Sequence, residues 1–389
     1  MGMGFAVFGG VPYICRKIAK GMKKQGMILL WMVLLLLQGF VGRADVDGPY
    51  VLYDSVGRMH VVRVDDGGRV LDSVYAGAAE GQSLYVASQD GRHRFRVRLR
   101  APRRPAWETP QAERTLVISD PHGDLDCLVS VLRNNGVIGA DYEWTFGRNQ
   151  LVVIGDVFDR GDDVVPIFWL LYKLEQEAEA AGGIATFLLG NHEEMVLRGN
   201  LKYARGKYIR LADSLGMDYS GLWHGNSELG RWLQTRNVMQ KAGGNLFVHA
   251  GLSGAFCAQE AAIPDINAEV GRTLFLSKEE RKAFSSLSSA IYNSSSGVLW
   301  YRGMVRSEDR YRPVYAEETG RILEQYGVER VFVGHTIFSE PTSFFGRKVI
   351  AVNVDNRENR EKSRSRGMLL EGDELYWIYD DCPPKIYPY

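Results

Sequence analysis

The stretch Leu151-Val-Val-Ile-Gly-Asp-Val-Phe-Asp-Arg-Gly161 decides the fold, because an apolar, β-branched run passes directly into a polar cluster. A short apolar run of this kind is typical of a buried strand, and the cluster lies where that strand ends. Four other stretches have the same form. They are Leu116-Val-Ile118 before Ser119-Asp-Pro-His-Gly-Asp124, Ala185-Thr-Phe-Leu-Leu189 before Gly190-Asn-His-Glu193, Leu246-Phe-Val248 before His249-Ala-Gly251, and Val331-Phe-Val333 before Gly334-His-Thr336.

Helical patterns lie between the early strands. Residues 125–134 and 164–180 carry apolar side chains at helical spacing, with Ile167, Phe168 and Leu171 on one side of the second helix. Alternating strands and helices predict an α/β domain built on a largely buried, partly parallel sheet. Because ligand sites gather at the carboxyl ends of strands in such sheets, we expect the five polar clusters to meet there.

Strand patterns return after Pro341, in residues 348–354, 367–370 and 374–379, and predict a second sheet that packs on the first. Two long inserts, residues 197–243 and 252–298, are helical and turn-rich. They begin just after polar clusters, so we expect them to cap the site.

The chain before this domain divides into a small antiparallel β module, residues 45–100, and a proline-rich linker, residues 101–114. The domain with its cap inserts then runs from residue 115 to residue 389. His60 and His93 lie in the β module without a carboxylate at ligand spacing. We therefore expect both to occupy exposed polar positions on strands rather than to bind metal.

Residues 1–44 have the pattern of a secretory signal peptide. Six bases and no acid accompany an apolar run of 14 residues, Met27–Phe40, and the small residues Gly42 and Ala44 follow. A membrane-spanning helix needs about 20 apolar residues, so we expect cleavage and a periplasmic or secreted protein without a stable membrane span. The alternative is a membrane anchor formed by residues 27–40. Without this segment the chain carries 41 bases against 47 acids, which argues against nucleic acid as a partner.

The polar clusters contain the ligand types that a pair of hard divalent cations requires, namely carboxylate, amide and imidazole groups. The candidate metal ligands are Asp120, His122, Asp156, Asn191, His249 and His335. None of them is a thiolate, which argues against a structural zinc site. Asp and His could instead simply end the strands, but that interpretation would have to hold for all five clusters at once.

These residues resemble the metallophosphoesterase superfamily and, within it, the PPP-type phosphatases. An Asp-x-His-Gly, a Gly-Asp-x-x-Asp-Arg-Gly, a Gly-Asn-His-Glu, a His-Ala-Gly and a Gly-His motif occur in the family's order between Thr115 and Val354. The resemblance implies a calcineurin-like β-sandwich flanked by helices. It also implies two divalent metal ions, with manganese, iron and zinc all compatible with these ligands.

The resemblance further implies a role for each motif residue. Asp120 and His122 would bind the first metal, Asp156 would bridge, and the second metal would be bound by Asn191, His249 and His335. His192 would be the general acid, held by Asp159. Arg160, Asn191 and Arg302 would bind the substrate phosphate. Arg302 lies in Leu299-Trp-Tyr-Arg-Gly303, and its alternative is a surface position.

Several motif residues differ from those of other branches of the superfamily, and these differences narrow the class of phosphoesterase that the chain resembles. Gly334-His-Thr-Ile337 offers a single histidine where many phosphodiesterases have two, and Asp159, Arg160 and Glu193 are unlike diadenosine-tetraphosphatase relatives. The Ser-Ala-Pro-Asn-Tyr segment of eukaryotic Ser/Thr phosphatases is replaced by Ser339-Glu-Pro-Thr-Ser-Phe-Phe345. The resemblance is therefore to the Shewanella-like or bacterial-type branch, and a Ser/Thr preference does not carry over.

The first insert is rich in aromatic residues, which have two interpretations. They could hold a phosphotyrosine ring, or they could pack the cap onto the core, and the sequence favours packing. The residues concerned are Tyr203, Tyr208, Tyr219, Trp223, His224 and Trp232.

The sequence thus predicts a metal-dependent phosphomonoesterase that acts on a phosphorylated protein or a small phosphoester. The reaction expected from the resemblance is direct attack of a hydroxide held by the two metals, without a phosphoenzyme. One alternative is hydrolysis of a dinucleoside polyphosphate or a phosphodiester. Another is a non-catalytic envelope binding protein, which the complete set of candidate ligands disfavours.

Overall fold

The computed structural model describes residues 46–77 and 79–388. The predicted signal peptide, residues 1–44, lies outside the described residues, so cleavage and export stay predictions. Within the described part of the chain, no helix is both long enough and apolar enough to cross a membrane.

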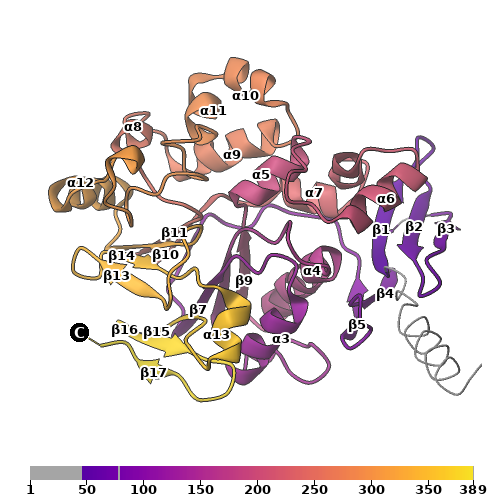
Figure 1. Ribbon diagram of the computed structural model, residues 1–389, viewed down its shortest axis with the longest axis horizontal. Coiled ribbons are helices and arrows are strands. Elements are labelled where there is room, and N and C mark those ends of the chain that lie inside the picture. The colour runs from indigo at the N-terminus through magenta and orange to yellow at the C-terminus, as the bar shows by residue number, and fades with distance from the viewer. Residues whose placement is uncertain (1–45, 78, 389) are drawn as a thin grey trace, which may run out of the picture. The chain divides into compact units, whose positions relative to one another are not determined.

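Two six-stranded sheets carry the predicted strands (Figure 1). The first sheet has the order β17 (Lys385–Ile386), β16 (Glu374–Ile378), β15 (Gly367–Glu371), β7 (Arg114–Ser119), β8 (Gln150–Ile154) and β9 (Ile184–Leu188). The second has the order β13 (Thr342–Phe344), β14 (Val349–Ala351), β12 (Arg330–Val333), β11 (Asn245–Val248), β10 (Met239–Ala242) and β6 (Glu108–Thr109). Strands β7, β8 and β9 are parallel, as are β11, β12 and β14. The five predicted strands are therefore present, divided between two sheets.

Apolar side chains from both sheets form one buried cluster. It includes Val117 and Val152 from the first sheet and Phe247 and Phe332 from the second, and each of these side chains is fully buried. The rings of Phe247 and Phe332 stack with centroids 5.1 Å apart. The predicted β-sandwich is confirmed.

The C-terminal strands do not form a second sheet of their own, contrary to the prediction. Strands β13 and β14 join the sheet of β11 and β12, whereas β15, β16 and β17 extend the first sheet. Strand β15 pairs antiparallel with β7, with Met368 opposite Val117. This pairing covers an edge of β7, whose buried side chains and open backbone groups would otherwise face solvent.

Helices α3 (Leu125–Asn134) and α4 (Val164–Ala180) begin and end at the predicted residues. Helix α4 is buried on more than the predicted side. The indole N–H of Trp169 donates to the Pro49 carbonyl at 2.8 Å, and the Tyr172 hydroxyl donates to the Arg100 carbonyl at 2.7 Å. The N-terminal β module therefore packs on α4 and shares its core.

The N-terminal β module consists of two small antiparallel sheets. Strands β1 (Asp47–Tyr53), β2 (Met59–Val64) and β3 (Val70–Tyr75) form one, and β4 (Ser83–Ala87) and β5 (Arg94–Arg98) form the other. His60 is partly exposed and contacts Asp72 at 2.8 Å. The expectation that His93 is exposed is wrong: the side chain is buried between the Tyr142 hydroxyl, at 2.9 Å, and Asp126, at 3.0 Å.

The predicted linker, residues 101–114, contains β6, which pairs parallel with β10 and so belongs to the second sheet. The first insert holds α6 (Gly206–Ser214), the 3₁₀ helix η1 (Tyr219–Trp223), α7 (Glu228–Gln234) and β10. The second insert holds α8 (Gly254–Cys257), α9 (Ile263–Thr273), α10 (Lys278–Phe284) and α11 (Ser286–Ile291). The remaining helices are α5 (Asn191–Leu197), η2 (Asp309–Tyr311), α12 (Ala316–Tyr326) and α13 (Asn356–Glu361).

Candidate active site

The candidate site is built where the backbone leaves the strands in left-handed conformations. Positive φ angles are rare for residues with a side chain and cost free energy, so their gathering in one place indicates a functional constraint. The site residues with positive φ are Asp120 (51°), His122 (41°), Asp156 (58°), Asp159 (72°), Arg160 (68°) and His335 (59°).

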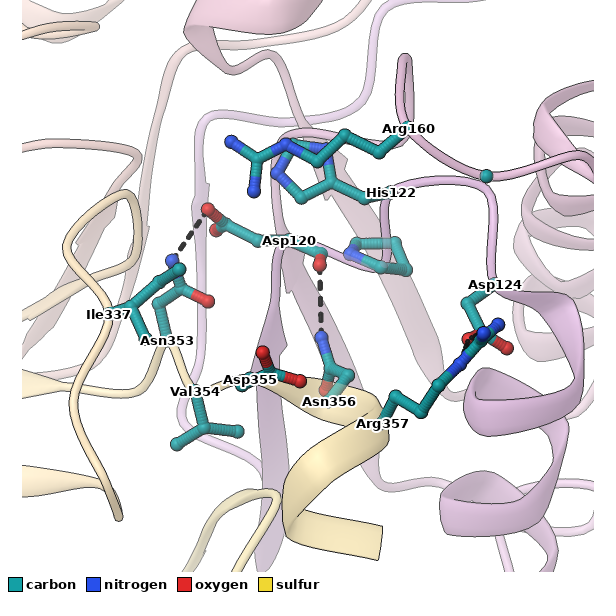
Figure 2. Close-up of a pocket in the computed structure, with 12 residues that line it drawn as sticks. Asp120, His122, Asp124, Arg160, Ile337, Asn353, Val354, Asp355, Asn356 and Arg357 are labelled. Atoms are coloured by element: carbon teal, nitrogen blue, oxygen red, sulfur yellow. Dashed lines mark hydrogen bonds and ion pairs between the residues drawn. The ribbon is translucent and has the colours of Figure 1, made fainter. Parts of the chain in front are cut away.

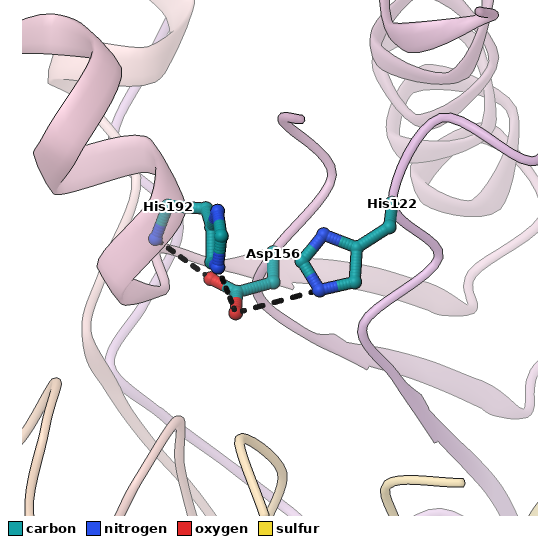
Figure 3. A group of neighbouring side chains, drawn as sticks. All are labelled: His122, Asp156 and His192. Carbon is teal, nitrogen blue, oxygen red and sulfur yellow. Dashed lines mark hydrogen bonds and ion pairs between the residues drawn. The ribbon is translucent and has the colours of Figure 1, made fainter. Parts of the chain in front are cut away.

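Asp156 lies at the centre of the site. Its Oδ2 atom is 3.2 Å from Nε2 of His249 and 3.9 Å from Nε2 of both His122 and His192. Figure 3 shows the imidazoles of His122 and His192 on two sides of this carboxylate, whose Oδ1 atom accepts the backbone N–H of His192 at 2.9 Å. A carboxylate in this position is suited to bridge two cations.

Two groups of donor atoms share Asp156. The first joins it to His122 and His192, and the second joins it to His249 and His335, with the ligand atoms of each group within 4.8 Å of one another. Asp156 is thus common to both groups, as a bridging ligand must be. The first group contains His192, to which the sequence assigned proton transfer rather than metal binding.

Asp120 is buried beside these groups without belonging to either. Its carboxylate accepts hydrogen bonds from Asn353 Nδ2 at 2.7 Å (Figure 2), from the His335 backbone N–H at 3.2 Å and from the Ser119 hydroxyl. Burial, together with the nearby charge of Asp156, raises the pKa of Asp120 to about 6. Two buried carboxylates without a cation repel each other, so a bound cation would relieve this cost.

Asn353 is a site residue that the sequence analysis missed. It follows β14 at the end of a buried strand, which is the same position that identified the other clusters. The sequence predicts a strand over residues 348–354 and so assigns Asn353 to it, rather than counting it with Asp355 and Asn356, which follow, as a further polar cluster.

The imidazoles of His249 and His335 differ in their surroundings. His249 donates from Nδ1 to the Ile154 carbonyl at 2.9 Å, which leaves Nε2 facing Asn191 Oδ1, also at 2.9 Å. The Nε2 atom of His335 is buried and has no hydrogen-bond partner among the described residues. A buried, unpaired imidazole nitrogen beside a carboxylate fits a metal ligand, because a cation would satisfy it.

The charges of the site act in opposite directions on these rings. Burial opposes protonation of His249, but the Asp156 carboxylate outweighs it and raises the pKa to about 9. Burial and the neighbouring His249 hold the pKa of His335 well below its usual range, and burial lowers the pKa of His122 to about 3. Neutral imidazoles are the form that binds metal, so His122 and His335 already have that form, whereas a cation at His249 would have to displace a proton.

His192 is held by a carboxylate. Its Nδ1 atom lies 2.6 Å from Oδ2 of the buried Asp159, so Nδ1 donates and Nε2 faces Asp156. Burial lowers the pKa of His192, but Asp156 and Asp159 together raise it above its usual value. The ring is therefore stabilised in the protonated form that a general acid requires.

Glu193 and Asp124 support the loops of the site, and Asp124 also lines the pocket that contains Asp120 and His122. The buried Glu193 carboxylate accepts the backbone N–H groups of Asp156 and Val157 at 2.8 Å, of Phe158 at 3.2 Å and of Gly190 at 2.7 Å. Asp124 is the N-cap of α3 and accepts the Cys127 N–H at 3.1 Å. Both residues fix the backbone beside the candidate ligands.

The two predicted arginines lie next to the donor groups. Arg160 is exposed, its guanidinium makes no hydrogen bond or ion pair with any described residue, and it lines a pocket of about 280 Å³ with Asp120 and His122. Figure 2 shows Arg160 and His122 on one wall of this pocket, opposite Asn356 and Arg357. Arg302 donates from Nη1 to the His335 carbonyl at 3.0 Å, so it does not occupy the surface position that was its alternative.

Most aromatic residues of the first insert are core residues. Tyr208, Tyr219, Trp223 and Trp232 are each no more than 2% exposed, and Trp232 stacks on Phe187 with ring centroids 5.7 Å apart. The packing interpretation is therefore right for these four. Tyr203 differs, because it is 42% exposed and its ring centroid lies 5.4 Å from that of His192.

Comparisons with known proteins identify the family. The calcineurin-like phosphoesterase family matches residues 113–337. Shewanella-like protein phosphatase 1 of Plasmodium berghei is 30% identical over 223 residues, which are 57% of this chain and 60% of that protein. Shewanella-like protein phosphatase 2 of Arabidopsis thaliana is 40% identical over 95 residues, 24% of each chain. The chain thus spans less than two thirds of the length of these relatives.

Among solved structures, the cold-active protein-tyrosine phosphatase of a psychrophilic Shewanella species superposes with a TM-score of 0.78 at 28% identity. The superposition covers 89% of this chain and 100% of that one. The chain belongs to the calcineurin-like phosphoesterase family, and its similarity is to the Shewanella-like branch of PPP-type phosphatases.

Proposed function

We propose that this protein is a metal-dependent phosphomonoesterase that acts on phosphorylated proteins. The observation that carries the proposal is the position of Asp156, which is common to two groups of buried donor atoms. The unpaired Nε2 atom of His335 supports metal binding at the second group. The relatives named as protein phosphatases support the substrate class.

Two divalent ions, manganese, iron or zinc, fit the nitrogen and oxygen donors of the site. The residues that would hold them are Asp120, His122, Asp156, Asn191, His249 and His335. When bound, the ions would neutralise phosphoryl oxygens and acidify a water molecule. Asn353 orients Asp120 through a hydrogen bond at 2.7 Å, and Glu193 holds the backbone of Asp156.

The side chains around the donor groups would bind and protonate the substrate. Arg160 presents an unpaired guanidinium, which can grip two phosphoryl oxygens at once. Arg302 keeps Nη2 and Nε available while Nη1 is bound to the His335 carbonyl. His192 would donate a proton from Nε2 to the leaving oxygen, and Asp159 would hold the ring through Nδ1.

Steady-state hydrolysis tests this proposal. Protein loaded with Mn²⁺ should release phosphate from p-nitrophenyl phosphate faster than from bis-p-nitrophenyl phosphate or a dinucleoside polyphosphate. Asp156→Asn and His192→Ala should lose activity severely, whereas His60→Ala, in the N-terminal module, should retain it. Absence of monoester hydrolysis, or full activity in His192→Ala, contradicts the proposal.

We also propose that the substrate is phosphotyrosine rather than phosphoserine or phosphothreonine. The support is the structural neighbour named as a protein-tyrosine phosphatase, which is 28% identical over most of both chains. A panel of peptides that differ only in the phosphorylated residue tests this preference.

Export remains part of the proposal, and it rests on the sequence of residues 1–44 alone. Mass spectrometry of the mature N-terminus tests it, because a mature protein that retains Met27–Phe40 contradicts cleavage.

A further inference from the structure

One exposed aromatic ring lies beside the proposed general acid. Tyr203 is 42% exposed, and its ring is tilted by 45° against that of His192, with centroids 5.4 Å apart. The other tyrosines and tryptophans of the first insert are buried in the core. Tyr203 is thus the aromatic residue of this insert that a substrate can reach.

The position of Tyr203 is fixed by its backbone. Its carbonyl accepts the N–H of Arg160 at 3.2 Å, so the tyrosine is tied to the loop that carries the phosphate-binding guanidinium. The Lys202 ammonium lies 4.8 Å from the centroid of the Tyr203 ring. The ring is therefore held near both Arg160 and His192, although Tyr203 remains 42% exposed.

The leaving group of the substrate has to approach this ring. A general acid donates its proton over a hydrogen-bond distance of about 2.6–3.2 Å, so the leaving oxygen must lie beside His192. The carbon atoms attached to that oxygen then lie in the space next to His192, where Tyr203 is. An aryl group there can form an edge or offset contact with the tyrosine ring, which a serine or threonine side chain cannot.

We propose that Tyr203 is a specificity-determining residue that contacts the aromatic ring of the leaving group and so favours aryl phosphomonoesters. This inference rests on the proposed function, since it takes His192 as the proton donor. The contact uses the ring of Tyr203 and not its hydroxyl. Tyr203→Phe should therefore keep the contact, whereas Tyr203→Ala should abolish it.

A binding experiment tests the contact without turnover. Titration calorimetry would compare benzylphosphonate with ethylphosphonate on Mn²⁺-loaded protein, because the two ligands differ only in the ring. Tyr203→Ala should weaken benzylphosphonate binding by about three- to tenfold, the range expected for one aromatic contact, and ethylphosphonate binding by less than about twofold. Tyr203→Phe should retain the preference. The control is Tyr85→Ala, which removes a tyrosine that is 48% exposed on β4, outside the site.

Two results would overturn the inference. One is an equal loss of binding affinity for benzylphosphonate and ethylphosphonate in Tyr203→Ala. The other is an unchanged preference for benzylphosphonate over ethylphosphonate in that variant. The kinetic counterpart is the ratio of kcat/KM for matched phosphotyrosine and phosphoserine peptides, which should fall in Tyr203→Ala alone. If wild-type protein hydrolyses neither peptide but shows the binding preference, the proposed function fails while the contact between Tyr203 and an aryl ring stands.

Discussion

The Nδ1 atom of His192 lies 2.6 Å from the Oδ2 atom of Asp159, and both side chains are buried. The pair joins the polar cluster after β8 to the start of α5. Because the carboxylate accepts from Nδ1, Nε2 is the nitrogen that faces Asp156 and the space for substrate. Asp159 therefore determines both the orientation and the proton-donating atom of His192.

Asp159→Asn should lower kcat by about 100-fold or more with little change in KM, because a misoriented imidazole loses most of the 10²–10⁴-fold that general acid catalysis supplies. The loss should be larger for an alkyl phosphate than for p-nitrophenyl phosphate, because p-nitrophenolate is a weaker base and depends less on proton donation. Steady-state kinetics with both substrates measures this difference, and equal losses on the two would argue against proton donation by His192.

His335→Ala should lower the metal content of the purified protein from two ions to about one per chain, because the second donor group loses its unpaired Nε2 atom. Elemental analysis after gel filtration measures the content. His93→Ala is the matched control, since His93 is also a buried histidine but contacts Tyr142 and Asp126 away from the donor groups. An equal loss of metal in both variants would contradict the assignment of His335.

Arg281→Ala should lower the free energy of unfolding by about 1.5–3 kcal/mol, because it removes a buried guanidinium bonded to the buried Glu194 carboxylate, which then keeps Arg198, at 2.7 Å, as a charge partner. The pair connects α10 of the second insert to α5, the helix that carries His192. Urea denaturation measures the change. Arg321→Ala, which breaks the exposed pair with Glu317, should cost less than about 1 kcal/mol. An equal loss of unfolding free energy in the two variants would show that burial of the ion pair does not determine its contribution to stability.

Asp163→Asn should stabilise the protein at neutral pH. Burial raises the pKa of Asp163 to about 6, so the folded state favours the protonated carboxyl. That stabilisation is complete below the unfolded pKa of about 3.8 and is lost as pH rises through about 6. Asparagine carries no charge and still accepts the Gln89 N–H, which is 2.7 Å from the carboxylate.

The measurement is the difference in unfolding free energy between Asp163→Asn and wild type from pH 4 to pH 8. The variant should gain about 1–2 kcal/mol at pH 8, and the gain should disappear near pH 4. A difference that is constant with pH would show that Asp163 does not titrate in this range.

Much of the site could be predicted from the sequence because it depends on local order. A short apolar run followed by Asp, His or Asn predicts a strand end, and the strands before Asp120, Asp156, Asn191, His249 and His335 are all present. The bounds of α3 and α4 follow from the spacing of their apolar residues. These features depend on neighbours within a few turns of chain, which a sequence records directly.

Other features depend on residues that are far apart in the chain. No local pattern shows that β15 pairs with β7, or that the amide of Asn353 reaches the carboxylate of Asp120, 233 residues away. His93 has the sequence surroundings of an exposed strand residue. In the structure it is buried, and its Nε2 atom contacts Asp126 of α3.

The sequence by itself determined the strand-end clusters, the ligand types and the family, because each follows from residue identity and spacing. The tertiary structure decided which sheet each strand joins and which side chains of the first insert remain open. Tyr203 and Tyr208 stand five positions apart with the same side chain, but only the first stays exposed. Exposure is set by what the rest of the chain packs against a residue, and that is a property of the folded molecule.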